Sequence, residues 1–282
     1  MADEFKGKNP RISHTWSECL AYVQAPQDAW NKGDERASHR KAKRDGSFHA
    51  LPSYQDAQAA MRLGWQPGRE RIQGEMSAAL AGVRTERVAA YRMDVAGERP
   101  NVALAVTGDP RCMYRRRPNV PRARPVVRVL VNVGAVWTVE PEHLARRGAA
   151  ILAWLDALEA AGWTTSLDAV WVASSLSSKG GGSIHYRVGL KAAGERFDLD
   201  RLSFALVCPD FLRRACFAVL EACPDLSGFF HGYGRQEDLP RDQIGDQVYF
   251  GAVHSAGPWR TTESALANVR IAIAAARQEV LA

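Results

Sequence analysis

The stretch PVVRVLVNVGAV (residues 125–136) decides the fold class. It is a nearly continuous run of β-branched and aliphatic residues, which is typical of a strand buried on both faces of a sheet. The next segment, EPEHLARRGAAILAWLDALEAAG (140–162), has apolar residues at helical spacing and ends at a glycine. A second apolar segment, WTTSLDAVWVAS (163–174), completes a right-handed β-α-β unit. The sequence therefore predicts an α/β fold with a mostly parallel sheet flanked by helices.

A glycine-rich linker, SSLSSKGGGS (174–183), leads to SIHYRVGLK (183–191), which has the composition of a strand. The linker leaves no room for a helix, so we expect this strand to run antiparallel to the preceding one and to form an edge of the sheet. The glycines do not match a phosphate loop, because in that motif a helix follows them. Farther along, the sequence predicts a helix after Asp198, a helix at 210–222, a strand at 247–254 and a terminal helix at 261–282.

The order of these elements from residue 125 onward resembles the von Willebrand factor A-type fold. The best-matching parts are VRVLVNVGAV and RRGAAILAWLDALEAAGW, and the resemblance covers residues 125–282, just over half of the chain. In that family the first strand ends in Asp-x-Ser-x-Ser, which binds a divalent metal. Residues 132–136 read Asn-Val-Gly-Ala-Val here, with no carboxylate and no hydroxyl. We therefore expect no metal site and no cofactor.

Charge is distributed unevenly along the chain. Residues 1–124 carry 22 Lys and Arg against 14 Asp and Glu, whereas residues 125–282 carry 15 against 17. These values give a net charge of +8 for the first part and −2 for the second, consistent with +6 for the whole chain. We predict three parts: a basic polar N-terminal arm (1–50), a small helical and extended region (51–124), and the α/β core (125–282).

The basic half favours a polyanionic partner, and we expect nonspecific, salt-sensitive contact with nucleic acid phosphates. The candidate contact residues are Arg40, Lys41, Lys43, Arg44, Arg115, Arg116, Arg117, Arg122 and Arg124. Two alternatives stay open. The segment 32–46 fits a solvated helix or a mobile arm equally well. The arginines could also meet acidic protein surfaces, which would make the chain a structural subunit of a virion or complex, or a self-assembling one.

A second candidate region lies at the carboxyl ends of the strands, where open α/β sheets bind ligands. We expect a ligand edge formed by Asn132, Thr138, Asp210, His231 and His254. No motif sets a nucleophile beside a base, so the sequence predicts no catalytic residue. The leading interpretation is a non-enzymatic binding or assembly protein, and an enzyme with a site at this edge is the alternative.

The remaining features bear on location and origin. The five cysteines form no CxxC pair, which argues against a zinc ribbon and a disulfide framework. The N-terminus lacks the apolar region of a secretory signal, and the longest apolar stretch carries Asp156 and Glu159. We expect a protein without membrane contact, cytoplasmic in a bacterial host or associated with a virion. The segments SYQDAQAAMRLGW, MDVAGERPNVALAVTGDPRCM and LVCPDFLRR also resemble uncharacterised proteins of bacteriophages and mobile elements, which implies no activity.

Overall fold

The main body of the protein is built on a six-stranded sheet. The computed structural model describes residues 11–24, 49–81, 91–97, 99–116, 126–136, 138–160, 162–174, 182–221 and 235–280. Five of its strands lie side by side in the order β1 (Arg11–Thr15), β7 (Ser183–Lys191), β6 (Thr164–Ser174), β5 (Val126–Asn132) and β9 (Val248–Phe250). A short strand, β8 (Arg235–Gln236), pairs antiparallel with the end of β6.

The predicted β-α-β unit is confirmed. β5 and β6 are parallel, in a register that sets Val126 opposite Thr164, and α6 (Pro141–Ala160) connects them. β9 pairs parallel with β5 on its other side. The α/β class with a mostly parallel sheet flanked by helices is likewise confirmed.

The predicted edge position of residues 183–191 is wrong. β7 runs antiparallel to β6 as expected, but β1 pairs with its other side, in a register that sets Arg11 opposite His185. Residues 11–24 lie within the predicted N-terminal arm, yet they form β1 and α1 (Trp16–Gln24), which packs against β7. The sheet edge is therefore supplied by the N-terminal part of the chain rather than by the core segment 125–282.

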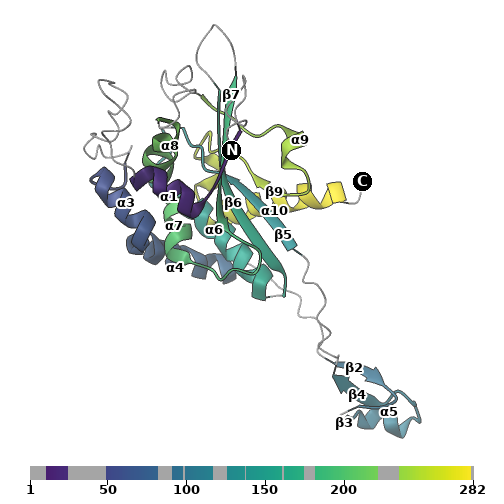
Figure 1. Ribbon diagram of the computed structural model, residues 1–282. Helices are drawn as coiled ribbons and strands as arrows, with labels where there is room; N and C mark the ends of the chain where they lie inside the picture. Colours follow the sequence, from purple (N-terminus) through teal and green to yellow (C-terminus); the bar gives the residue numbers. More distant parts are fainter. Residues whose placement is uncertain are drawn as a thin grey trace, which may run out of the picture.

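Most helices cover one face of the sheet. Figure 1 shows α3 (Tyr54–Leu63), α4 (Gln66–Ala81) and α7 (Leu199–Val207) on one side of the sheet and α9 (Arg241–Ile244) on the other. The alternation of side chains along each strand sends Val129, Trp171 and Tyr186 into the large core beneath these helices. A π-helical turn, η3 (Phe211–Cys216), continues into α8 (Phe217–Glu221), and both pack on this face. The terminal helix α10 (Thr262–Val280), preceded by the short η5 (Gly257–Trp259), packs against α6 and β9.

The helix layer is closely packed at one glycine. α6 crosses α7 at Gly148, where a Cβ atom would lie 2.8 Å from Val207 Cγ2 and 3.3 Å from the Leu206 carbonyl oxygen. The second face of the sheet has only a small apolar cluster, formed by Leu130, Val170 and Val172 with partly buried Leu239 and Tyr249. Only the segment that contains β8 and α9 covers this face among the described residues, so space remains there for a pocket.

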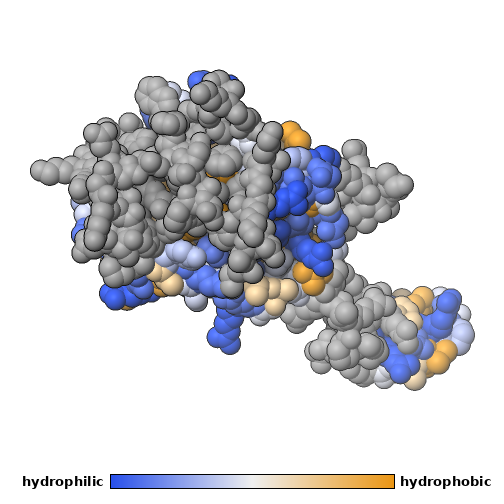
Figure 2. All heavy atoms as spheres, turned by 45° about the horizontal axis from the view of Figure 1, so that its top comes forward, coloured by the Kyte–Doolittle hydropathy of each residue, from blue (hydrophilic) through white to orange (hydrophobic). Residues whose placement is uncertain are grey.

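Residues 91–116 form a separate small unit, which we call the β2–β4 module. Its strands are β2 (Tyr91–Asp94), β4 (Met113–Arg116) and β3 (Arg99–Pro100), in that order, with α5 (Val102–Val106) between β3 and β4. The Asn101 side chain caps α5 by accepting a hydrogen bond from the Leu104 N–H. Figure 1 draws the module apart from the main body, and Figure 2 shows hydrophobic and hydrophilic residues together on its surface.

Candidate functional site

Asn132, one of the predicted ligand residues, is fully buried at the end of β5. Its Nδ2 donates hydrogen bonds to the Glu237 carbonyl oxygen at 2.7 Å and to the Tyr249 hydroxyl at 3.1 Å. Its Oδ1 accepts from the Gly134 N–H at 2.9 Å. These contacts occupy both polar atoms of the amide, so Asn132 ties the segment that follows β8 to the sheet.

The same network extends to the sheet edge. The Tyr249 hydroxyl donates to Asp238 Oδ1 at 2.9 Å and accepts from the Leu239 N–H at 3.0 Å, and burial raises the pKa of this phenol. Asp238 Oδ1 also accepts from the Ala252 N–H, and Asp238 Oδ2 lies 3.6 Å from Nε2 of the half-exposed His254. The structure thus connects Asn132 with His254 through Tyr249 and Asp238. Thr138 is exposed on the loop before α6.

Asp210 serves as a buried counter-ion, although the sequence placed it at the ligand edge. Its Oδ1 accepts from Arg214 Nε at 2.5 Å and from His49 Nδ1 at 2.9 Å, and its Oδ2 accepts from two backbone N–H groups, those of Ala50 and Leu51. Burial would raise the pKa of Asp210, but the hydrogen bonds from His49 and Leu51 and the charge of Arg214 outweigh it and lower this pKa. The carboxylate is fully engaged within the protein.

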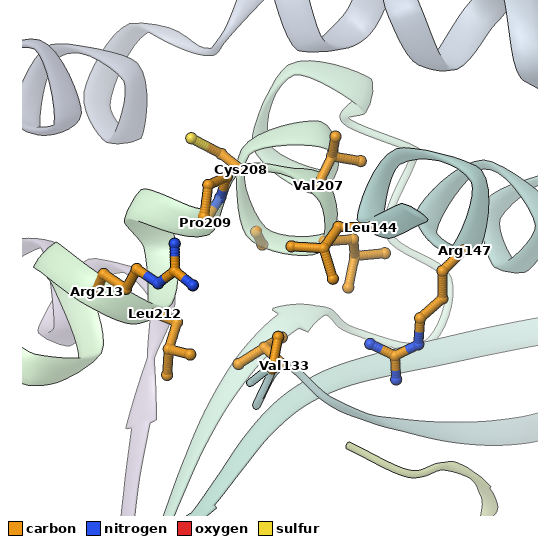
Figure 3. Close-up of a pocket in the computed structure, with 11 residues that line it drawn as sticks. Val133, Leu144, Arg147, Val207, Cys208, Pro209, Leu212 and Arg213 are labelled. Carbon is orange, nitrogen blue, oxygen red and sulfur yellow. The ribbon is translucent and has the colours of Figure 1, made fainter. Parts of the chain in front are cut away.

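A small cavity lies at the end of β5, between two buried arginines. Its volume is about 20 Å³, which is room for one water molecule and no larger ligand. Figure 3 shows Arg147 and Arg213 on opposite sides of it, with Val133 and Leu144 between them. The Arg147 Nη2 donates to the carbonyl oxygens of Phe250 and Gly251, at 3.2 and 2.8 Å, and burial lowers its pKa to about 10. This arginine therefore fastens the end of β9 to α6.

A larger pocket of about 260 Å³ opens on the second face of the sheet. Its apolar floor consists of Leu130, Val170 and Leu239, and β1, β7 and α9 provide its polar walls. The polar lining residues are Arg11, Ser13, His185, Arg187, Asp242 and Gln243. Arg187 is held in the wall, since its guanidinium binds Asp168 and donates to Gln247 Oε1 at 2.9 Å. This pocket is larger than the cavity between Arg147 and Arg213.

His185, which lines this pocket, is hydrogen-bonded to Ser183. His185 Nδ1 lies 2.7 Å from Gln243 Oε1, and His185 Nε2 lies 2.9 Å from the Ser183 hydroxyl. An amide oxygen only accepts, so Nδ1 carries the proton and Nε2 accepts from the serine. Burial lowers the pKa of His185, and the charge of Arg11 lowers it further. Together they outweigh the hydrogen bond to Gln243 and the charges of Glu237 and Asp242, which raise this pKa. The imidazole is therefore neutral at pH 7.

Sequence reasoning missed this arrangement. Ser183 and His185 are two residues apart on a predicted strand, which places both side chains on one face, and that signal was available. Gln243 comes from α9, and nothing in the local sequence relates it to β7. Among the other predicted residues, Arg115 is half-exposed in β4 and pairs with Asp94 at 3.2 Å. For Arg116 the structure places only the backbone, in β4. The predicted residues outside the described ranges are Arg40, Lys41, Lys43, Arg44, Arg117, Arg122, Arg124 and His231.

A family model described as "Domain of unknown function (DUF7192)" matches residues 13–272. The chain belongs to this family. No curated protein and no solved structure gave a significant match. The DUF7192 match begins within β1 and ends within α10, so it includes the β2–β4 module together with all of the main sheet except the first two residues of β1.

The described residues of this DUF7192 chain contain no group of three or more His, Cys, Asp or Glu side chains placed to hold a metal ion. Within the same ranges, no helix has the length and apolar character that crossing a membrane requires.

Proposed function

We propose that the protein binds nucleic acid nonspecifically through the β2–β4 module and its flanking segments, as a binding or assembly protein rather than through catalysis. The observation that carries this proposal is the location of the charge. Residues 84–124 contain ten arginines and four acidic residues, a net charge of +6. The other residues contain 27 basic and 27 acidic side chains, so this one segment accounts for the net charge of the whole chain. Concentrated charge of this kind attracts a polyanion.

The exposure of the arginines in the module supports phosphate contact. The Arg111 side chain is 72% exposed and lies 3.9 Å from Asp109, and the Arg115 side chain is 51% exposed. Ion pairs this exposed contribute little stability, so a phosphate can replace the carboxylate at small cost. The planar guanidinium also suits bidentate binding of phosphate oxygens.

A structural subunit that binds protein partners is the second candidate function. The module exposes Val95, Val102 and Val106, which are 65%, 70% and 83% exposed. Valines this exposed, next to arginines, suit an acidic protein surface with apolar neighbours. A von Willebrand factor A-like character of the core and a bacteriophage or mobile-element origin remain parts of this proposal, and they rest on the resemblances in the sequence.

Fluorescence anisotropy of labelled DNA and RNA, measured between about 50 and 200 mM salt, tests the proposal. The triple variant R111Q/R115Q/R117Q should bind more weakly at low salt. It should also flatten the slope of log affinity against log salt by up to about 2.7, because each neutralised phosphate contributes about 0.9.

The matched control is R62Q/R196Q/R260Q, which removes the same charge from exposed positions on the main body. The slope of log affinity against log salt for this control should equal that of the wild type. Absence of binding by the wild type at low salt, or binding without a salt slope, would refute the proposal. Stable self-association without nucleic acid, measured by light scattering, would instead favour the structural subunit.

A further inference from the structure

We propose that Ser183 is a nucleophile, with His185 as its general base and Gln243 as the residue that positions the base, for hydrolysis of a short-chain carboxylic ester. This activity goes beyond nucleic acid binding and concerns a different part of the molecule. It rests on a nucleophile, a base and an orienting group that are joined by two hydrogen bonds. His185 and Gln243 line the pocket, and Ser183 is reached from it through its hydrogen bond to His185.

The hydrogen bonds give each group one role. Gln243 accepts from Nδ1 of His185, which fixes the tautomer and leaves the lone pair of Nε2 directed at the Ser183 hydroxyl. A general base must lie within about 2.6–3.2 Å of the proton-bearing atom, and the 2.9 Å separation satisfies this condition. Gln243 thus occupies the place that a carboxylate or amide holds in other arrangements of nucleophile, base and orienting residue.

The topology puts these residues where α/β sheets bind ligands. β7 is antiparallel to β6, so the beginning of β7 lies at the carboxyl end of β6, with Ser183 opposite Ser174 and His185 opposite Val172. Ligands in open α/β sheets bind beyond the carboxyl ends of the parallel strands. The sequence predicted a ligand edge at this end of the sheet, and the structure supplies a different set of residues for it.

The pocket indicates the class of substrate. Its floor of Leu130, Val170 and Leu239 is apolar, which suits the hydrocarbon part of an acyl group. A volume of about 260 Å³ is just below the range of about 300–1,000 Å³ for drug-sized ligands, so the acyl group must be short. Arg11 is exposed on β1 at the pocket wall, and its charge helps to keep His185 unprotonated, so that Nε2 is available to accept a proton.

The reaction consumes one water molecule for each ester. The Ser183 oxygen bonds to the ester carbonyl carbon as its proton moves to His185 Nε2, and the bond to the alcohol oxygen breaks as that oxygen takes the same proton. A water molecule then attacks the acyl-serine and gives a proton to His185. The serine oxygen recovers this proton when the carboxylic acid leaves, so enzyme and histidine return to their initial states.

Labelling with a fluorophosphonate probe, followed by peptide mapping, tests the nucleophile directly. The serine oxygen displaces fluoride from phosphorus and the proton passes to His185. We expect one adduct at Ser183, none in S183A, and undiminished labelling in the control S174A, which removes the cross-strand neighbouring hydroxyl. A correctly folded wild type without an adduct at Ser183, or one labelled equally at other serines, would overturn the proposal.

The pH dependence tests the base even where a histidine variant fails to fold. Labelling and p-nitrophenyl butyrate hydrolysis should increase as His185 loses its proton, and level off by about pH 7 because its pKa lies below the usual value of about 6.5. A rate that instead increases steadily to high pH would overturn the role of His185. H185Q should lower the rate by about a hundredfold or more.

The positioning role of Gln243 is tested by a shift of the pH profile rather than by a loss of labelling. Q243E supplies a carboxylate acceptor, so it should retain labelling and move the pH profile to higher pH, whereas Q243A should slow labelling. An unchanged profile in both variants would contradict the positioning role. R111Q/R115Q/R117Q should label like the wild type, so this proposal and nucleic acid binding can fail separately.

Discussion

Replacing Asp210 by asparagine should strongly destabilise the fold, because it removes a buried charge from a buried pair. Asp210 and Arg214 both have 0% exposed side chains, and Asp210 Oδ1 lies 2.5 Å from Arg214 Nε. Removing one partner of such a pair costs about 3–5 kcal/mol in the free energy of unfolding. The asparagine oxygen can still accept from one of the N–H groups of Ala50 and Leu51, so we expect about 4 kcal/mol for D210N.

Urea unfolding followed by circular dichroism measures this change, and D246N is the matched control. Asp246 is 68% exposed and lies 3.6 Å from Arg128, so its neutralisation should cost less than about 1 kcal/mol. For a chain of this size, 4 kcal/mol corresponds to a decrease in Tm of about 8–16 °C. In the double variant D210N/R214M, much of the loss should be recovered, since the unpaired buried cation is gone as well.

The effect of D210N also has a defined pH dependence. The pKa of Asp210 is lower in the folded protein than in the unfolded chain, where it is about 3.9. Its stabilisation is therefore complete above that value and disappears as the pH falls through the folded-state pKa. The difference between wild type and D210N should shrink in this acidic range. A cost for D210N no larger than that of D246N at pH 7 would refute the assignment of Asp210 as a counter-ion.

Three further outcomes are expected. G148A should cost about 1–3 kcal/mol in the free energy of unfolding, measured in urea, because its methyl group contacts Val207. G74A has open space around its methyl group and should stabilise α4 by about 0.5–1 kcal/mol. Equal effects of the two variants would contradict the close packing of α6 and α7. N132A should cost about 2–4 kcal/mol and expose the segment 235–247 to limited proteolysis, since the carbonyl of that segment loses its donor. Thiol labelling with peptide mapping should modify Cys112 well before the buried Cys19, Cys208 and Cys216. Burial raises the pKa of Cys19 to about 12, which slows its reaction further.

The parts of the fold that the sequence predicted are those encoded by local periodicity. The β5-α6-β6 unit combines an aliphatic run with a helical pattern of apolar residues, and the structure contains the strand and the helix that these patterns predict. The sequence did not predict strand β1, because one of its two inward-facing side chains is a histidine. His14 is buried beside Ile12, contacts the Tyr186 hydroxyl at 3.3 Å and stacks on Tyr22. A polar residue that is satisfied in the core gives no apolar alternation to detect.

The candidate site residues likewise divide into contacts that local spacing predicts and contacts that only the tertiary structure makes. Arg214 follows Asp210 by four residues, the helical spacing of an ion pair, whereas His49 reaches it from 161 residues away. Asn132 was correctly placed at the end of a strand, but its partners come from the segment after β8. The sequence thus indicated where polar groups gather along each element, and tertiary contacts decided whether they anchor the fold or remain accessible. The three-part division of the chain stays a prediction.

The pairing of β1 with β7 has a consequence for how the protein folds during synthesis. Arg11 pairs with His185, so β1 leaves the ribosome about 170 residues before its partner strand. At about 5–20 residues per second, this delay is roughly 9–35 s. Pairing of β1 with β7 therefore closes a long chain loop, which slows folding. The edge of β7 is open until β1 pairs with it, and the pocket that contains Arg11 also requires Leu239 and Gln243, which are synthesised later still.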